Sequence, residues 1–476
     1  MRLPAIVVAV CSFAVLFAVT PAAADETDKS DKKTDASKTK AVETNAEPAE
    51  LISAEAEIAD DTVVEKKVDV SKPGYHVGDT WFELHGYARM PINLQSTPRE
   101  PFLIDNDYFL SGFSYTRLYE PDWTELFLSA HNGNYTVRFG LFASLYSDYA
   151  TPELENQFGI AQASVRANKF LNYDQLSVEL GVFWDRFGHI APYDTYMFGR
   201  THQGGLKTRW QFKKDAHLQV GLGAHQEQLQ QNQGLTPVAH INAQWPFGKA
   251  VVGGYLLRSW TRDKRQLSPI QDGDLWVAGA DVRYDLPKGL GKAYLAASYY
   301  KASKVLYLAP ALELMHSTGG RGLTENFLGL DSSNDGTGSL YNLAADIPLT
   351  VTKKVGVRAF GMMSWVRSDQ VDAMNPLMNR DRRLYLKWGV EPGYKISDTI
   401  RASLRYDRVI LDMHDAENSF RVFSPRVSFP LSKWGELFVM FSHYRYGDKI
   451  QLRPGQVPLE TMPDSNVFKV QAQAIW

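Results

Sequence analysis

The end of the chain, NVFKVQAQAIW, alternates between two kinds of side chain with a period of two. One face is apolar and the other is mainly polar: Phe468, Val470, Ala472, Ala474 and Trp476 against Val467, Lys469, Gln471, Gln473 and Ile475. A strand of about ten residues with one apolar face has the length of a single bilayer crossing in a β-barrel. An amphipathic edge strand of a soluble β-protein would show the same pattern, so recurrence of the pattern upstream distinguishes the two.

The alternation recurs through most of the chain. Residues 82–90, 176–185, 276–286, 355–365 and 400–407 each place apolar side chains on one face and polar or charged ones on the other. No stretch of comparable length has apolar residues at helical spacing. The sequence therefore predicts an all-β fold.

Short and long connections alternate between these strands. Turn-like segments lie at 132–134, 167–173, 213–216, 246–248, 287–291, 348–354, 396–399 and 430–435. Longer segments lie between them, at 93–121, 186–203, 226–234, 261–272, 303–338, 367–381 and 447–465. Short turns on one side and long loops on the other are typical of transmembrane barrels. Eight short turns predict about 18 antiparallel up-and-down strands, with about 16 as the alternative because residues 109–119 also have strand character.

Aromatic residues gather at the strand ends, as an interfacial belt requires. Toward the long loops lie Trp184, Trp260, Trp365 and Tyr406, and toward the short turns lie Trp245, Tyr394, Phe429 and Trp476. In a soluble sandwich such residues would be scattered along the core face. Their position at the strand ends favours two lipid interfaces.

The beginning of the chain has a different character. Residues 1–24 have the charged start, apolar run and A-x-A site of a signal peptide, with cleavage expected after Ala24. The single cysteine, Cys11, lies inside it, so no disulfide is expected in the mature protein. Residues 25–77 are predicted to form a disordered acidic periplasmic extension, and residues 78–476 the barrel.

The signal peptide, the alternation, the loop asymmetry and the terminal aromatic together resemble Gram-negative outer-membrane porin-like β-barrels. The predicted strand number near 18 is similar to that of the saccharide porins and polysaccharide-export barrels. The resemblance implies an outer-membrane location, contact with the lipid bilayer and lipopolysaccharide, and recognition of the C-terminal strand by the barrel-assembly machinery. The extension suggests a periplasmic polysaccharide-export partner. The resemblance is architectural, so no functional residue is transferred from it.

The polar face of the strands supplies the candidate pore-lining residues. They are Arg89, Arg138, Arg283, Arg358, Arg401, Arg405, Asp185, Asp281 and Asp407, and the wider inward set includes Arg166, Glu83, Glu125, Glu179, Asp285 and Glu391. Opposed rows of charge would select polar solutes, and an arginine excess would favour anions such as uronic-acid polymers. The alternative is that these charges pair across strands and only hold the barrel wall.

The loop at 184–205 combines aromatic and charged side chains. Arg186, Tyr193, Asp194, Tyr196 and Arg200 are the candidates for a saccharide constriction inside the pore. A loop that packs over the barrel mouth for its own stability would have the same composition, and the sequence leaves both readings open.

No enzymatic or metal motif accompanies the barrel pattern. G-x-S-x-G, H-E-x-x-H and P-loop signatures are absent from the sequence. No cofactor, catalytic residue, metal site or nucleic-acid partner is expected. The sequence predicts an outer-membrane channel for polar solutes, with saccharides or an exported polysaccharide favoured. The alternatives are a plugged barrel that anchors or binds surface polysaccharide, a general diffusion porin and an outer-membrane hydrolase.

Overall fold

The computed structural model describes residues 74–96, 123–143, 158–186, 200–226, 235–261, 273–303, 337–369, 380–410, 413–415, 417, 419–432, 435–448 and 463–475. All of them belong to one compact unit, Glu50–Trp476. The predicted signal peptide with Cys11, and the extension up to residue 73, lie outside the described residues.

Most of the described residues form β-strands. The strands are β1 (Gly74–Val77), β2 (Thr80–Gln95), β3 (Trp123–Asn132), β4 (Tyr135–Ala143), β5 (Phe158–Ala167), β6 (Leu176–Arg186), β7 (Arg200–Lys213), β8 (Ala216–Gln226), β9 (Leu235–Phe247), β10 (Ala250–Thr261), β11 (Gly273–Asp285), β12 (Lys292–Ser303), β13 (Thr337–Thr350), β14 (Val355–Ser368), β15 (Arg382–Lys395), β16 (Arg401–Ile410), β17 (Ser419–Ser432), β18 (Gly435–Tyr446) and β19 (Ser465–Ile475). Two 3₁₀ turns, η4 (Phe170–Asn172) and η7 (Pro287–Gly289), connect strands. None of the described helices has the length and apolar character that a membrane span needs.

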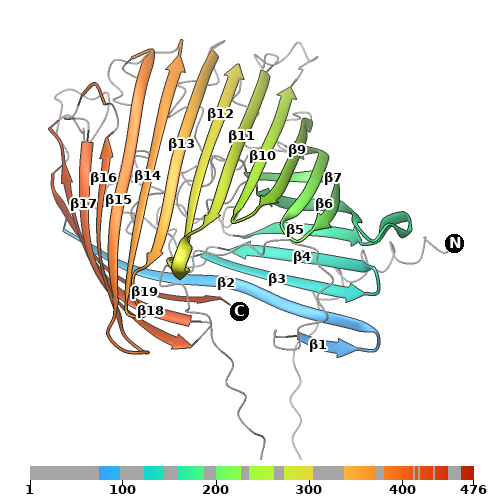
Figure 1. Ribbon diagram of the computed structural model, residues 1–476, viewed down its shortest axis with the longest axis horizontal. Coiled ribbons are helices and arrows are strands. Elements are labelled where there is room, and N and C mark those ends of the chain that lie inside the picture. Colours follow the sequence, from blue (N-terminus) through green and yellow to red (C-terminus); the bar gives the residue numbers. More distant parts are fainter. Residues whose placement is uncertain are drawn as a thin grey trace, which may run out of the picture. The chain divides into compact units, whose positions relative to one another are not determined.

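The strands from β2 to β19 form a closed antiparallel barrel (Figure 1). Each strand pairs with the next one along the chain, and β19 pairs back onto β2 with Ala472 opposite Met90 and Ala474 opposite Ala88. Closure leaves neither β2 nor β19 with an unpaired edge. The predictions of 18 strands and of a closing C-terminal strand are confirmed.

Strand pairing begins slightly earlier than the predicted boundary at residue 78. The four residues of β1 form a hairpin with the start of β2, with Val77 opposite Thr80. Aromatic contacts hold this hairpin, because the Tyr75 ring stacks on Phe82 at 5.3 Å and the His76 ring lies 4.8 Å from Trp81. Gly74–Val77 therefore belongs with the barrel and not with the extension.

The alternation of short and long connections is confirmed. The short ones join β3 to β4, β5 to β6, β7 to β8, β9 to β10, β11 to β12, β13 to β14, β15 to β16 and β17 to β18. The β3–β4 turn contains Gly133 with a positive φ of 52°, a conformation that glycine adopts without a steric penalty. The long connections, including residues 109–119, lie mostly outside the described residues.

Strand β14 shows how the alternation produces two faces. Its burial alternates residue by residue, with Arg358, Phe360 and Met362 buried on one side. On the other side Trp365 is 42% exposed. The same contrast holds around the barrel, where large apolar side chains such as Leu343 and Phe441 are exposed on the outer face. The buried face, which carries the polar and charged side chains, is called the lumenal face below.

Candidate functional site: a cationic wall on the lumenal face

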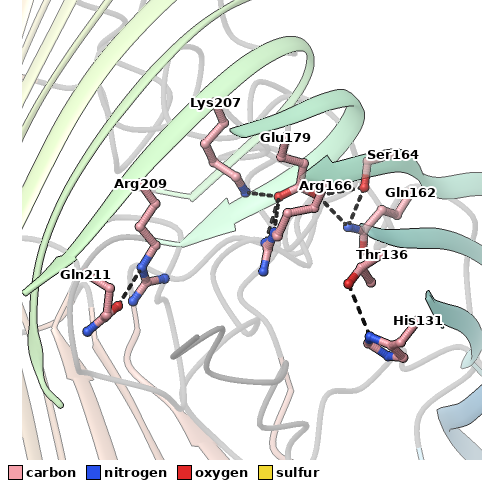
Figure 2. A network of polar contacts seen from close by, with 9 residues as sticks. All are labelled: His131, Thr136, Gln162, Ser164, Arg166, Glu179, Lys207, Arg209 and Gln211. Atoms are coloured by element: carbon pink, nitrogen blue, oxygen red, sulfur yellow. Dashed lines mark hydrogen bonds and ion pairs between the residues drawn. The ribbon is translucent and has the colours of Figure 1, made fainter. Parts of the chain in front are cut away.

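Three consecutive strands bring one carboxylate between two cations. Glu179 on β6 lies directly opposite Arg166 on β5 and directly opposite Lys207 on β7. The period of two turns all three side chains to the lumenal face, and each is buried. Figure 2 shows them pointing toward one another from the three strands. These residues, together with Ser164, are called the cationic wall.

Glu179 accepts hydrogen bonds on both carboxylate oxygens. The Arg166 guanidinium donates to Oε2 from Nη2 at 2.7 Å and from Nε at 3.2 Å, and Lys207 Nζ lies 3.2 Å from the same oxygen. The Ser164 hydroxyl donates to Oε1 at 2.6 Å. Lys207 also lies over the Phe183 ring, with Nζ 4.3 Å from its centroid. These contacts fix both cations in place.

The cationic wall carries a net positive charge. Two cations share one carboxylate, and the side chains of Arg166, Lys207 and Glu179 are 5%, 6% and 2% exposed. Coulomb interactions are screened less at such sites than in bulk water. The arrangement therefore attracts anions, and the ammonium and guanidinium groups can donate hydrogen bonds to them.

Further hydrogen-bonding groups, one of them the Arg209 guanidinium, continue the same face along β7, β8 and β9. Arg209 donates from Nε to Gln211 at 3.1 Å, and its Nη2 lies 3.2 Å from His217 Nδ1. His217 in turn contacts the Asn242 amide oxygen at 3.1 Å. The amide and imidazole groups beside the cationic wall suit a solute rich in hydroxyl groups.

A row of three glycines next to the cationic wall brings neighbouring backbones close together. Gly181 lies opposite Gly205, which lies opposite Gly223, on β6, β7 and β8. Gly181 has a φ of 137°, and a Cβ there would lie 2.2 Å from the Ala163 carbonyl oxygen. At this level the barrel wall consists of backbone without side chains, because a side chain at Gly181 or Gly205 would collide with a neighbouring strand.

On the opposite side of the barrel, two arginines each contact one aspartate. Strands β13 to β17 lie about half the ring away from β6, and there Arg358 donates to Asp346 at 2.8 and 2.7 Å. On β16 Arg405 donates to Asp407 at 2.8 Å, and both side chains are buried. The pairs Arg358–Asp346 and Arg405–Asp407 are called the paired wall.

The structure places the predicted pore-lining residues as follows. Arg358, Arg405 and Asp407 belong to the paired wall, and Asp281 is buried on the lumenal face of β11. Arg283 lies 3.4 Å from Asp215. The backbone register puts Arg89 opposite Trp123, Arg138 opposite Ser164, and Arg401 opposite Lys395. These residues are spread around the barrel and do not form one cluster.

The predicted loop constriction is largely outside the described residues. Tyr193, Asp194 and Tyr196 lie there, while Arg186 and Arg200 are directly opposite each other where β6 and β7 end and begin. Asp185 is opposite Thr201 on the same strand pair. Whether these residues narrow a pore stays a prediction.

The sequence analysis did not single out the cationic wall. Arg166 and Glu179 were in the wider inward set, but Lys207 was missed. The alternation of Gln203, Gly205, Lys207 and Arg209 on β7 was the available signal, since it puts Lys207 on the lumenal face. The register that joins β5, β6 and β7 could not be read from one strand. Among the described residues no group of His, Cys, Asp and Glu could hold a metal ion.

The closed barrel with an apolar outer face defines the class of protein as a transmembrane β-barrel of the outer-membrane type. Aromatic side chains are exposed near both ends of the strands, with Trp245 and Tyr394 toward the short turns and Trp365 toward the long loops. The side chains of Trp184 and Trp476 lie outside the described residues.

No protein-family model and no curated protein sequence matches the chain. Solved structures with a similar fold include OccAB1 of Acinetobacter baumannii, with 9% identity and a TM-score of 0.45 over 85% of this chain and 98% of that chain. An anion-selective porin from Comamonas acidovorans has 12% identity and a TM-score of 0.43 over 83% of this chain and 100% of that chain. OmpT, an outer membrane protein of Vibrio cholerae, has 10% identity and a TM-score of 0.43 over 85% and 100%. These values leave the solute of this chain open.

Proposed function

We propose that the protein is an outer-membrane channel for polar solutes that favours anions. The observation that carries the proposal is the buried Glu179, which Arg166 and Lys207 both contact, so that this part of the lumenal face holds two cations against one carboxylate. On the paired wall, by contrast, Arg358 and Arg405 each contact one carboxylate, that of Asp346 and that of Asp407. We expect an anion in the lumen to be attracted to the wall that holds two cations against one carboxylate.

Acidic saccharides are the solutes that we propose for this channel, either taken up or exported as a polysaccharide. The support is the combination of cations with amide and hydroxyl groups on neighbouring strands, at Gln203, Gln219, Asn242 and Ser259. Such groups hydrogen-bond sugar hydroxyls, while the cationic wall binds the carboxylate of a uronic acid. A periplasmic export partner for residues 25–77 remains part of this proposal.

Planar-bilayer recordings test the channel and its selectivity together. In a salt gradient the reversal potential is expected to show a preference for chloride over potassium. A preference for potassium would overturn the anionic assignment. A barrel that folds correctly and conducts nothing would overturn the channel itself and favour the plugged barrel.

A second recording tests the saccharide class. A uronic-acid oligomer is expected to block the current at a concentration at which a neutral oligomer of the same length does not. Equal block by the two oligomers would remove the role of the cationic wall in solute choice. Absence of block by both would favour a general diffusion porin.

A further inference from the structure

A row of arginines lies on the outer face of the barrel, where apolar side chains predominate. Arg408 on β16 is directly opposite Arg421 on β17, and Arg421 is directly opposite Arg445 on β18. The three have the same parity along their strands as the exposed apolar residues Phe423 and Phe441. Arg421 and Arg445 are exposed and Arg408 is half-buried. We call these three residues the arginine row.

The arginine row concentrates like charge on three neighbouring strands. Directly opposite residues of antiparallel strands have Cα atoms about 4.5–5.5 Å apart, so three guanidinium groups occupy a short arc of the barrel. Like charges directly opposite each other destabilise a sheet. Within the described part of the chain, no ion pair joins Arg408, Arg421 or Arg445 to a carboxylate. An anion from outside the chain would relieve this repulsion.

The arginine row lies at the level of one membrane interface. Each of the three residues is within three positions of the strand end that faces the long connections, not the short turns. Aromatic side chains accompany it: Trp388 is opposite Arg408, and its ring lies 5.4 Å from that of Tyr406. Rings of this kind mark the interface in transmembrane barrels, where the cost of an arginine is far lower than at the midplane. The guanidinium groups are therefore at headgroup height.

The opposite ends of the strands carry lysine instead. The short turns contain Lys213, Lys214, Lys249, Lys288, Lys353 and Lys354. A lysine is a flexible point charge, whereas the planar guanidinium group matches the geometry of a phosphate with two parallel hydrogen bonds. The side of the barrel with long loops thus has the residue type that recognises phosphate, arranged on three neighbouring strands.

We propose that the arginine row binds the phosphate groups of a glycolipid in the outer leaflet, as in the phosphorylated lipid A part of lipopolysaccharide. The apolar residues below the row, including Phe423 and Phe441, contact the acyl chains, while the guanidinium groups bind the headgroup phosphates. The site is distinct from the lumenal face and is independent of the solute that the channel passes. It fixes the barrel to a particular lipid at β16, β17 and β18.

A matched control is present on the same face. Arg258 on β10 is also near the end with the long connections, but it has its own carboxylate, Asp274, at 3.2 Å. Its guanidinium lies 5.4 Å from the Trp260 ring centroid and 4.7 Å from that of Trp276. The variant R258Q therefore removes an outer-face arginine that already has a carboxylate partner within the chain.

The test is native mass spectrometry of the full-length mature barrel in detergent with bisphosphorylated lipid A and with the same lipid after removal of its phosphates. The unmodified barrel is expected to bind the phosphorylated form at least about tenfold more tightly. R408Q/R421Q/R445Q is expected to lose this preference, whereas R258Q keeps it. An unchanged preference in the triple variant, or an equal loss in R258Q, would overturn the proposal.

Two further variants keep the test valid if the triple glutamine variant does not fold. R408K/R421K/R445K retains the charge but loses the paired hydrogen bonds, so it is expected to keep only part of the preference. R421Q alone removes the central residue and is expected to lower the preference about threefold. Inorganic phosphate that displaces lipid A at an equal concentration would overturn the lipid as the ligand.

Discussion

The cationic wall and the paired wall use the same residue types on opposite sides of one barrel, with different results. Arg166 and Lys207 lie on either side of Glu179 in strand register, so one carboxylate serves two cations. Arg405 and Asp407 are two positions apart on a single strand and neutralise each other. The shared carboxylate of the cationic wall thus depends on which strands become neighbours, whereas the Arg405–Asp407 pair forms within one strand.

The comparison separates two roles for lumenal charge. On the paired wall, Arg358 and Asp346 join β14 to β13, while Arg405 and Asp407 contact each other within β16. On the cationic wall, two cations share one carboxylate, and we propose that this arrangement biases the lumen toward anions. Variants of the paired wall are therefore expected to change the stability of the barrel, and variants of the cationic wall its selectivity.

The largest expected effect comes from breaking the paired wall. Arg358→Gln leaves the buried Asp346 without the guanidinium that donates two hydrogen bonds to it, which should lower the free energy of unfolding by about 3–5 kcal/mol. Chemical denaturation in detergent micelles measures this. The double variant D346N/R358Q should lose less, because it leaves no buried charge. A single variant as stable as the double would contradict the structural role of the pair.

A smaller loss of stability is expected from a substitution at Gly181, next to the cationic wall. Gly181→Ala places a Cβ against the Ala163 carbonyl at a φ of 137°, so the free energy of unfolding should fall by about 1–3 kcal/mol. The same unfolding measurement checks this. Gly254→Ala is the control, because a Cβ there would meet only a carbonyl oxygen at 3.7 Å. Equal losses of unfolding free energy in the two variants would show that the position of Gly181 does not require glycine.

The smallest effect is expected at Asp398, in a short turn on the same side of the barrel as the paired wall. Asp398 in the β15–β16 turn lies 2.6 Å from Lys395 Nζ, and this contact lowers the pKa of Asp398 below its usual range. A carboxyl group whose pKa is lowered by folding stabilises the protein above its unfolded pKa and loses that contribution as the pH falls through the folded pKa. Asp398→Asn should therefore change stability only slightly near neutral pH and not at all in strong acid. A difference that grows on acidification would contradict this assignment.

The sequence predicted the fold more completely than the site. The alternation along residues such as Phe82–Met90 and the eight short turns were sufficient for the strand number, because each strand's own residues specify its faces. The partners of Glu179 depend on register between strands, which a single strand does not contain. The arginine row was missed for the same reason: Arg408, Arg421 and Arg445 become neighbours only when β16, β17 and β18 pair.

If the two cations of the cationic wall set the selectivity of the channel, Lys207→Gln should reduce that selectivity. This variant leaves Arg166 and Glu179 paired one to one, as on the paired wall. The reversal potential in a potassium chloride gradient should show a roughly fivefold loss of anion preference, since one charge at about 4 Å contributes about 1 kcal/mol in water. D346N/R358Q, which removes charge without changing the net value, should keep the original preference. An unchanged reversal potential in Lys207→Gln, or an equal shift in the double variant, would contradict the account.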